Sequence, residues 1–264
     1  MLKTRILTAL IGIPLVLLLV WLGGAFYSAV VMLLALLAMR ELIITSRHSE
    51  TPVAGGWGYL LLICNFFLLA AVAWGLHQQL VMLWLLPVLL LSGAVLSYSS
   101  SRKMSLASMS VTFLAAAYVA LFAFLISLRG FPIWGAALTW AALLAVWSGD
   151  SAAYFVGKAI GHKRLSALSP GKTVEGTIGG IVAGLIVGAI VARIGGLDWR
   201  FAFAVGALAS LTAPIGDLVA SYWKRELKVK DFGSIFPGHG GVLDRCDSLI
   251  FAAFAVYLFA TWLL

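Results

Sequence analysis

Long apolar runs separated by short polar segments dominate this sequence. Each run holds about 17 to 25 mainly apolar residues, which is long enough to cross the hydrocarbon layer of a bilayer as one helix. Helices are required there because lipid offers no partner to an open backbone N–H or C=O group. The runs lie at residues 6–23, 25–45, 53–74, 79–99, 107–128, 133–156, 174–194, 200–223 and 246–264. The sequence therefore predicts an all-α, polytopic integral membrane helix bundle with about nine transmembrane helices.

The composition supports this interpretation. Of the 264 residues, 62% are hydrophobic and only 11% are charged. A soluble domain needs a polar exterior, and this chain has too few polar residues to build one. The net charge of +8 would suggest nucleic acid as the partner of a soluble protein, but in a membrane protein the distribution of charge among the loops matters more. We therefore expect a lipid bilayer around the chain and no nucleic acid as a partner.

The basic residues are distributed unevenly between the two sides of such a bundle. If the N-terminus is cytoplasmic, 15 of the 18 Lys and Arg residues fall on the cytoplasmic side. Cytoplasmic loops of membrane proteins carry an excess of Lys and Arg. We therefore expect a multi-pass protein of the cell membrane (inner or plasma membrane), with a cytoplasmic N-terminus and the C-terminus on the opposite side. The two most basic loops, 157–173 and 224–245, then share the cytoplasmic face.

The acidic residues divide the chain into two parts of a single membrane domain. Among the ten acids, only Glu41 and Glu50 precede residue 150. We expect residues 1–130, with the first five runs, to form a scaffold. Residues 131–264, with the last four runs and their cytoplasmic loops, should form an active site that faces the cytoplasm.

Asp150 and Asp217 are acids inside the apolar runs. Asp150 is near the cytoplasmic end of run 133–156, and Asp217 is about two turns from the end of run 200–223. An ionisable group in lipid is costly, so it usually faces an interior cavity and marks function. The structural alternative is an acid near the interface that pairs with a lysine and holds helices together. Asp217, Ser221 and Lys224 are spaced to share one helix face that leads out to the loop.

The segment KRELKVKDFGSIFPGHGGVLDRCD, residues 224–247, interleaves cations and carboxylates around a glycine turn. Lys and Arg supply positive charge for phosphate oxygens. Glycines let backbone N–H groups approach an anion just ahead of a helix N-terminus. Carboxylates suit Mg²⁺, which binds a few of them together with substrate phosphates. The segment therefore predicts a site for a metal–polyphosphate complex, in which His239 could act as a general base or simply hydrogen-bond a phosphate or a carbonyl group.

The other basic loop contains LSPGKTVEGTIGG, residues 168–180. It is not a P-loop, because Ser166 stands where that motif needs glycine and no strand precedes it. Lys172 can still reach a phosphate from the same side of the membrane as the segment 224–247. Thr173 can cap a helix, with Glu175 following, and capping alone would explain both residues.

The sequence from Ser221 to Asp247 resembles the C-terminal signature of CDP-diacylglycerol synthases, also called phosphatidate cytidylyltransferases. That signature reads S-x-x-K-R-x(4)-K-D-x(5)-P-x-H-G-G-x-x-D-R-x-D, and every fixed position matches. GDSAAYFVGKAIGHKRLSALSPGKTVEG upstream looks like the second motif of the family, and the resemblance covers essentially the whole chain. It implies a Mg²⁺-dependent nucleotidyltransferase that joins CTP to phosphatidic acid and gives CDP-diacylglycerol and pyrophosphate.

The residue types and the resemblance together give the candidate site. The catalytic candidates are Lys172, Asp217, His239, Asp244, Arg245 and Asp247. The candidates for substrate binding are Asp150, Lys172, Thr173, Ser221, Lys224, Arg225, Lys230, Gly240, Gly241 and Arg245. The expected Mg²⁺ ligands are Asp217, Asp244 and Asp247, with room for a second cation. The expected partners are CTP, phosphatidic acid and the bilayer, and the glycine-rich run 174–194 suggests tight packing against a neighbouring helix or a second copy in a homodimer.

Two other functions compete with this hypothesis. A CTP-dependent lipid kinase, such as a polyprenol kinase of related architecture, would release CDP instead of pyrophosphate. An ion-coupled transporter would use Asp150 and Asp217 as an ion pathway. It predicts acids near the middle of the bilayer and discontinuous helices in paired repeats, whereas the acids here crowd one face.

Overall fold

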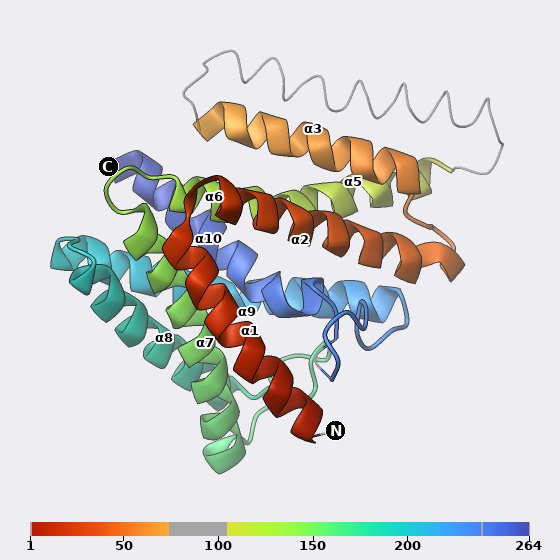
Figure 1. Ribbon diagram of the computed structural model, residues 1–264. Helices are drawn as coiled ribbons and strands as arrows, with labels where there is room; N and C mark the ends of the chain where they lie inside the picture. The colour runs from red at the N-terminus through yellow and green to blue at the C-terminus, as the bar shows by residue number, and fades with distance from the viewer. Residues whose placement is uncertain (1, 74–104, 239, 264) are drawn as a thin grey trace.

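The computed structural model describes residues 2–73, 105–238 and 240–263, and these ranges are helical apart from turns and loops (Figure 1). The all-α prediction is confirmed, because the described ranges contain no β-strand and only two isolated bridges, Arg164 with Thr173 and Phe236 with Gly240. The predicted run 79–99 and the candidate His239 lie outside the described residues.

The helices follow the predicted runs closely. They are α1 (Leu2–Leu22), α2 (Gly24–Thr45), the short 3₁₀ helix η1 (Ser46–His48), α3 (Gly55–Ala73), α5 (Leu106–Ala120), α6 (Phe122–Arg129), α7 (Gly135–Ile160), α8 (Val174–Ile194), α9 (Trp199–Glu226) and α10 (Leu243–Leu263). The single run predicted at 107–128 is interrupted at Leu121, which separates α5 from α6.

Four segments of the described residues are long and apolar enough to cross a membrane. They are Gly24–His48, Leu106–Arg129, Val174–Ile194 and Trp199–Glu226. Two shorter apolar helices, Leu10–Leu22 and Gly55–Phe67, accompany them. The membrane class of the bundle therefore agrees with the sequence, while the number of about nine spans stays a prediction.

The glycine-rich run forms α8 and packs inside the molecule. Its buried residues are all small and recur every fourth position: Gly176, Gly180, Gly184, Gly188 and Ala192. A Cβ atom built at Gly180 would lie 2.7 Å from the carbonyl oxygen of Gly149 in α7, so only glycine lets the two backbones approach this closely. Gly188 meets Gly206 of α9 in the same way. The predicted tight packing is therefore with neighbouring helices, and the glycine face is not left open for a second copy.

The arrangement of the helices gathers the two basic loops at one end of the molecule. The N-terminus and the loops that follow α7 and α9 lie in the lower half of Figure 1, whereas the C-terminus lies at the upper left. Helices α9 and α10 pack extensively and run in opposite directions on either side of the loop 227–242. The end of α9 therefore lies beside the start of α10, where the predicted acids are.

Candidate active site

Helices α9 and α10 make their closest approach beside two predicted acids. A Cβ atom at Gly216 would overlap the main-chain oxygen of Asp247 and lie 2.9 Å from Cδ2 of Phe251. Only glycine fits at this crossing, since any side chain would push the helices apart. The carboxylates of Asp217 and Asp247, which directly flank the contact, interact electrostatically with each other. The fold thus brings together two acids that the sequence placed in separate runs.

Lys172 joins this pair of acids from the other basic loop. Its Nζ lies 2.7 Å from Oδ2 of Asp217, with 36% of the lysine side chain and 21% of the aspartate side chain exposed. Arg225 links the two basic loops, because its Nε donates a hydrogen bond to the carbonyl oxygen of Leu168 at 3.3 Å. The loop that carries Lys172 therefore contacts the segment 224–247, as expected, through Leu168 and Arg225. Asp150 of α7 interacts electrostatically with Lys172, Asp217 and Arg245, so it borders the same site.

Asp247 is a buried carboxylate without a neighbouring cation at ion-pair distance in the described part of the chain. Only 7% of the residue is exposed. Its Oδ1 accepts a hydrogen bond from the backbone N–H of Ser248 at 2.7 Å. The two ion pairs among the described residues involve Asp217 and Asp244. Burying a charge without a partner is costly, so this carboxylate is suited to bind a cation from outside the chain.

Asp244 differs from its neighbour because the protein itself satisfies both carboxylate oxygens. Its Oδ1 pairs with Nζ of Lys224 at 2.9 Å. Its Oδ2 accepts hydrogen bonds from the N–H groups of Phe232 at 2.8 Å and Gly241 at 3.0 Å. Through these hydrogen bonds Asp244, at the start of α10, holds Phe232 and Gly241 of the preceding loop in place.

Lys224 and Asp244 form a pair that is shielded from solvent. Their side chains are 16% and 2% exposed, and Nζ of Lys224 also lies 5.4 Å from the centre of the Phe232 ring. Lys224 was predicted to bind substrate, and in the structure its ammonium group is already engaged. Its neighbours Arg225, Lys228 and Lys230 line a basic pocket of about 540 Å³ together with Lys224 itself.

We expect Lys224→Met to lower stability as well as activity. Methionine keeps most of the side-chain length but leaves Oδ1 of the buried Asp244 without a cation, and removing one partner of a buried pair costs about 3–5 kcal/mol. Thermal unfolding of the purified protein in detergent measures the loss. Lys228→Met is the matched control for stability, because Lys228 is exposed. A Lys224→Met protein that unfolds at the wild-type temperature would show that the pair adds nothing.

The remaining candidates surround this centre in different ways. Thr173 caps α8 as predicted, since its Oγ1 accepts the N–H of Gly176 at 3.1 Å. Gly240 has a positive φ of 85°, and a Cβ there would lie 2.9 Å from Oδ2 of Asp244. Ser221 is half-buried, and Arg245 is exposed at the start of α10. Their proposed roles in binding substrate stay predictions.

Glu41 of α2 is a component of the site that sequence reasoning missed. It is 4% exposed, and its carboxylate accepts hydrogen bonds from the N–H groups of Val242 at 2.8 Å and Leu243 at 3.1 Å. It therefore caps the N-terminus of α10 from a helix that was assigned to the scaffold. The signal was present, because Glu41 is an acid inside an apolar run, like Asp150 and Asp217.

The carboxylates of the site provide some of the oxygen donors that the expected Mg²⁺ would need. In the ranges that the structure describes, no three His, Cys, Asp or Glu side chains lie close enough to form a ready metal cluster. Two of the predicted ligands, Asp217 and Asp247, are nevertheless carboxylates that interact electrostatically across the contact of α9 and α10, and Asp247 is buried without an ion-pair partner among the described residues. Hard oxygen donors of this kind, with coordination positions left for substrate phosphates, fit Mg²⁺.

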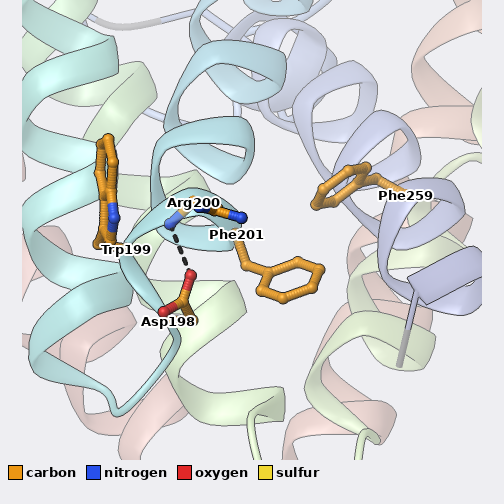
Figure 2. Close-up of a pocket in the computed structure, with 5 residues that line it drawn as sticks. All are labelled: Asp198, Trp199, Arg200, Phe201 and Phe259. Carbon is orange, nitrogen blue, oxygen red and sulfur yellow. Dashed lines mark hydrogen bonds between the residues drawn. The ribbon is translucent and has the colours of Figure 1, made fainter.

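A separate pocket of about 600 Å³ lies at the other end of α9 (Figure 2). It is lined by Asp198, Trp199, Arg200, Phe201 and Phe259. Oδ1 of Asp198 accepts the backbone N–H of Arg200 at 2.9 Å, so this acid caps α9. The pocket is roughly 28 Å along the helix from Asp217 at 1.5 Å per residue, and none of the predicted site residues lines it.

The comparison with known proteins covers nearly the whole chain. The model of the cytidylyltransferase family matches residues 3–263. The phosphatidate cytidylyltransferase of Staphylococcus haemolyticus (strain JCSC1435) is 35% identical over 253 residues, which is 94% of this chain and 95% of the relative. That of Bacillus subtilis (strain 168) is 34% identical over 259 residues, 94% of each chain. That of Synechocystis sp. (strain ATCC 27184 / PCC 6803 / Kazusa) is 41% identical over 140 residues, 52% of this chain and 47% of the relative. This protein therefore belongs to the cytidylyltransferase family.

Proposed function

We propose that this protein is a phosphatidate cytidylyltransferase, which transfers CMP from CTP to phosphatidic acid and releases CDP-diacylglycerol and pyrophosphate. The match to relatives of that name along 94% of the chain supports the proposal. The observation that carries it is the gathering of Lys172, Asp217 and Asp247 beside a basic pocket at one end of the bundle. Such a site can serve a soluble triphosphate and a lipid phosphate together.

In the proposed reaction, an oxygen of the phosphatidate phosphate attacks the α-phosphorus of CTP. A new P–O bond forms to that phosphorus, the bond to the bridging oxygen of the β-phosphate breaks, and pyrophosphate leaves with its charge. Arg225, Lys230 and Arg245 are exposed and can bind phosphate oxygens. Lys172 can exchange its contact with Asp217 for a phosphate, because more than a third of its side chain is exposed. Positioning and charge neutralisation of this kind account for most catalysis of phosphoryl transfer.

We propose that Asp217 and Asp247 hold Mg²⁺ at this site. Asp244, the third predicted ligand, is the least available, because Lys224 and two backbone N–H groups already occupy its carboxylate. When bound, Mg²⁺ would neutralise phosphate charge and favour departure of pyrophosphate. The predicted second cation and the predicted proton transfer by His239 remain part of the hypothesis, without further support.

We also propose the membrane setting that the loops predict. About nine spans, a cytoplasmic N-terminus and an active site facing the cytoplasm fit the excess of Lys and Arg on one side. The bacterial relatives and the helices of membrane-spanning length support a location in the inner or plasma membrane. A homodimer would have to use a surface other than the glycine face of α8, which α7 and α9 cover.

Product analysis tests this function directly. Purified protein in detergent micelles with phosphatidate, Mg²⁺ and CTP labelled at the α-phosphate is expected to give labelled CDP-lipid, with one pyrophosphate for each. A lipid kinase would instead release labelled CDP and leave the lipid unlabelled, because it transfers only the γ-phosphate to an alcohol. An ion-coupled transporter would leave CTP intact. Either of these outcomes would exclude the cytidylyltransferase.

A further inference from the structure

Tyr118 of α5 carries a buried hydroxyl group without a hydrogen-bond partner in the described part of the chain. Only 7% of the residue is exposed, and its hydroxyl oxygen is fully buried. Buried hydroxyl groups almost always have a partner, because burial without one costs free energy. In contrast, the hydroxyl of Tyr27, which is 3% exposed, donates a hydrogen bond to the carbonyl oxygen of Leu125 at 3.3 Å. An unpartnered hydroxyl such as that of Tyr118 suggests a role beyond packing.

The ring of Tyr118 is held at the crossing of α9 and α10. It stacks on Trp223 of α9, with ring centres 6.5 Å apart and planes 8° from parallel. It also contacts Phe251 of α10 at 6.2 Å in a tilted arrangement. Phe251 also lies close to Gly216, which precedes Asp217 in the chain and contacts the backbone of Asp247. Two aromatic neighbours therefore fix the phenol at the contact that brings the two acids together.

The hydroxyl group lies among the carboxylates of the site. Three aspartates interact electrostatically with the hydroxyl group. Among them the interaction with Asp247 is the strongest, followed by those with Asp217 and Asp244. Asp244 is satisfied by Lys224 and two N–H groups, and Asp217 is paired with Lys172. Asp247 accepts the N–H of Ser248 on Oδ1, so its Oδ2 has capacity for a further bond. An O–H donor and a carboxylate acceptor thus remain in one buried region.

We propose that Tyr118 is a positioning residue of the active site, whose hydroxyl donates a hydrogen bond to Asp247 when that carboxylate holds a divalent cation. The inference rests on the proposed metal site and extends it to a helix of the presumed scaffold. Ligating carboxylates are commonly held by such outer hydrogen bonds, and losing one typically lowers metal affinity or activity by 10–100-fold. The alternative is that Tyr118 only fills space between α9 and α10.

Tyr118→Phe separates these two roles, because it removes one oxygen and keeps the stacked ring. Binding of Mn²⁺ alone to the purified protein in detergent, followed by electron paramagnetic resonance, is expected to weaken by about 10-fold or more. The melting temperature of the metal-free protein should stay the same or rise, because the hydroxyl removed there is buried and has no partner among the described residues. The Mg²⁺ concentration that half-saturates turnover should rise by a similar factor. Unchanged Mn²⁺ affinity in Tyr118→Phe would overturn the proposal, and so would a wild-type protein that binds no Mn²⁺.

Tyr27→Phe is the matched control, with the opposite expected signature. It deletes a hydroxyl that does donate a hydrogen bond, so the melting temperature should fall by about 2–4 °C while Mn²⁺ affinity stays at the wild-type value. The Mn²⁺ measurement does not depend on turnover. Absence of CDP-lipid formation by the wild type would therefore defeat the proposed function, whereas equal Mn²⁺ binding by wild type and Tyr118→Phe would defeat only the role of Tyr118.

Discussion

Asp217→Asn and Asp247→Asn are each expected to abolish formation of CDP-lipid while the protein still folds and inserts. Asparagine has nearly the same shape as aspartate but lacks the negative charge that a divalent cation requires. Asp217→Asn also leaves Lys172 without its partner, and this pair is partly exposed, so its loss should affect stability little. A loss of activity of at least about 10²–10³-fold is expected, which is typical of removing one preorganised electrostatic group. Initial rates at saturating CTP, together with the melting temperature, measure both effects.

Asp198→Asn is the matched control for this pair of substitutions. It makes the same chemical change at the other end of α9, where Asp198 caps the helix. Asparagine caps helices as well as aspartate does, so both stability and turnover should be retained. If Asp217→Asn or Asp247→Asn kept activity within a few-fold of Asp198→Asn, that acid would not belong to the catalytic site.

The helices themselves could be predicted well from the sequence. The run at 174–194 coincides with α8, and the other described runs match helices within a few residues, apart from the interruption at Leu121. Length and apolar content are strong signals in a membrane protein because the bilayer admits few alternatives. Leu121 gave no such signal, since it is as apolar as its neighbours and the break does not depend on glycine or proline.

The meeting of the two basic loops could also be predicted, but the different surroundings of the acids could not. The excess of basic residues placed both loops on one side, and in the structure Arg225 of one loop donates a hydrogen bond to Leu168 of the other. The sequence gives Asp244 and Asp247 the same appearance, three residues apart in one motif. Their difference comes from the loop: Phe232 and Gly241 present their N–H groups to Asp244, and Asp247 lies beyond their reach. Nearly every residue has a backbone N–H group, so the sequence does not indicate which of these groups will bind a given carboxylate. The difference between Asp244 and Asp247 is therefore seen only in the structure.

Glu41 shows the same limit over a longer distance. Its partners are backbone N–H groups 201 and 202 residues away along the chain. Nothing in the sequence around Val242 and Leu243 calls for a carboxylate from α2. Space around Glu41 is also tight, because a Cβ at Gly241 would overlap its carboxylate and one at Gly233 would lie 2.6 Å from it. Those two glycines therefore leave room for the carboxylate of Glu41, in addition to any role in binding an anion.

Glu41→Ala is expected to destabilise the protein strongly and to lower turnover with it. The substitution leaves the N–H groups of Val242 and Leu243 buried without acceptors at the positive end of α10. Each hydrogen bond to a charged group contributes about 1.5–3 kcal/mol, so the two together contribute about 3–6 kcal/mol. That is a large share of the 5–15 kcal/mol that stabilises a typical domain. Glu41→Gln keeps one acceptor oxygen and should lose roughly half as much.

The melting temperatures of wild type, Glu41→Gln and Glu41→Ala should therefore fall in that order, and Glu50→Ala provides the matched control because Glu50 is exposed just beyond α2. The loss of turnover should follow the same order, since Asp244 and Asp247 lie in the first two turns of the helix that Glu41 caps. Val242 and Leu243, whose N–H groups Glu41 accepts, are not predicted site residues, so Glu41 acts through the position of these two acids. If Glu41→Ala matched Glu50→Ala in both measurements, water would be satisfying the N–H groups, and the start of α10 would hold its place without α2.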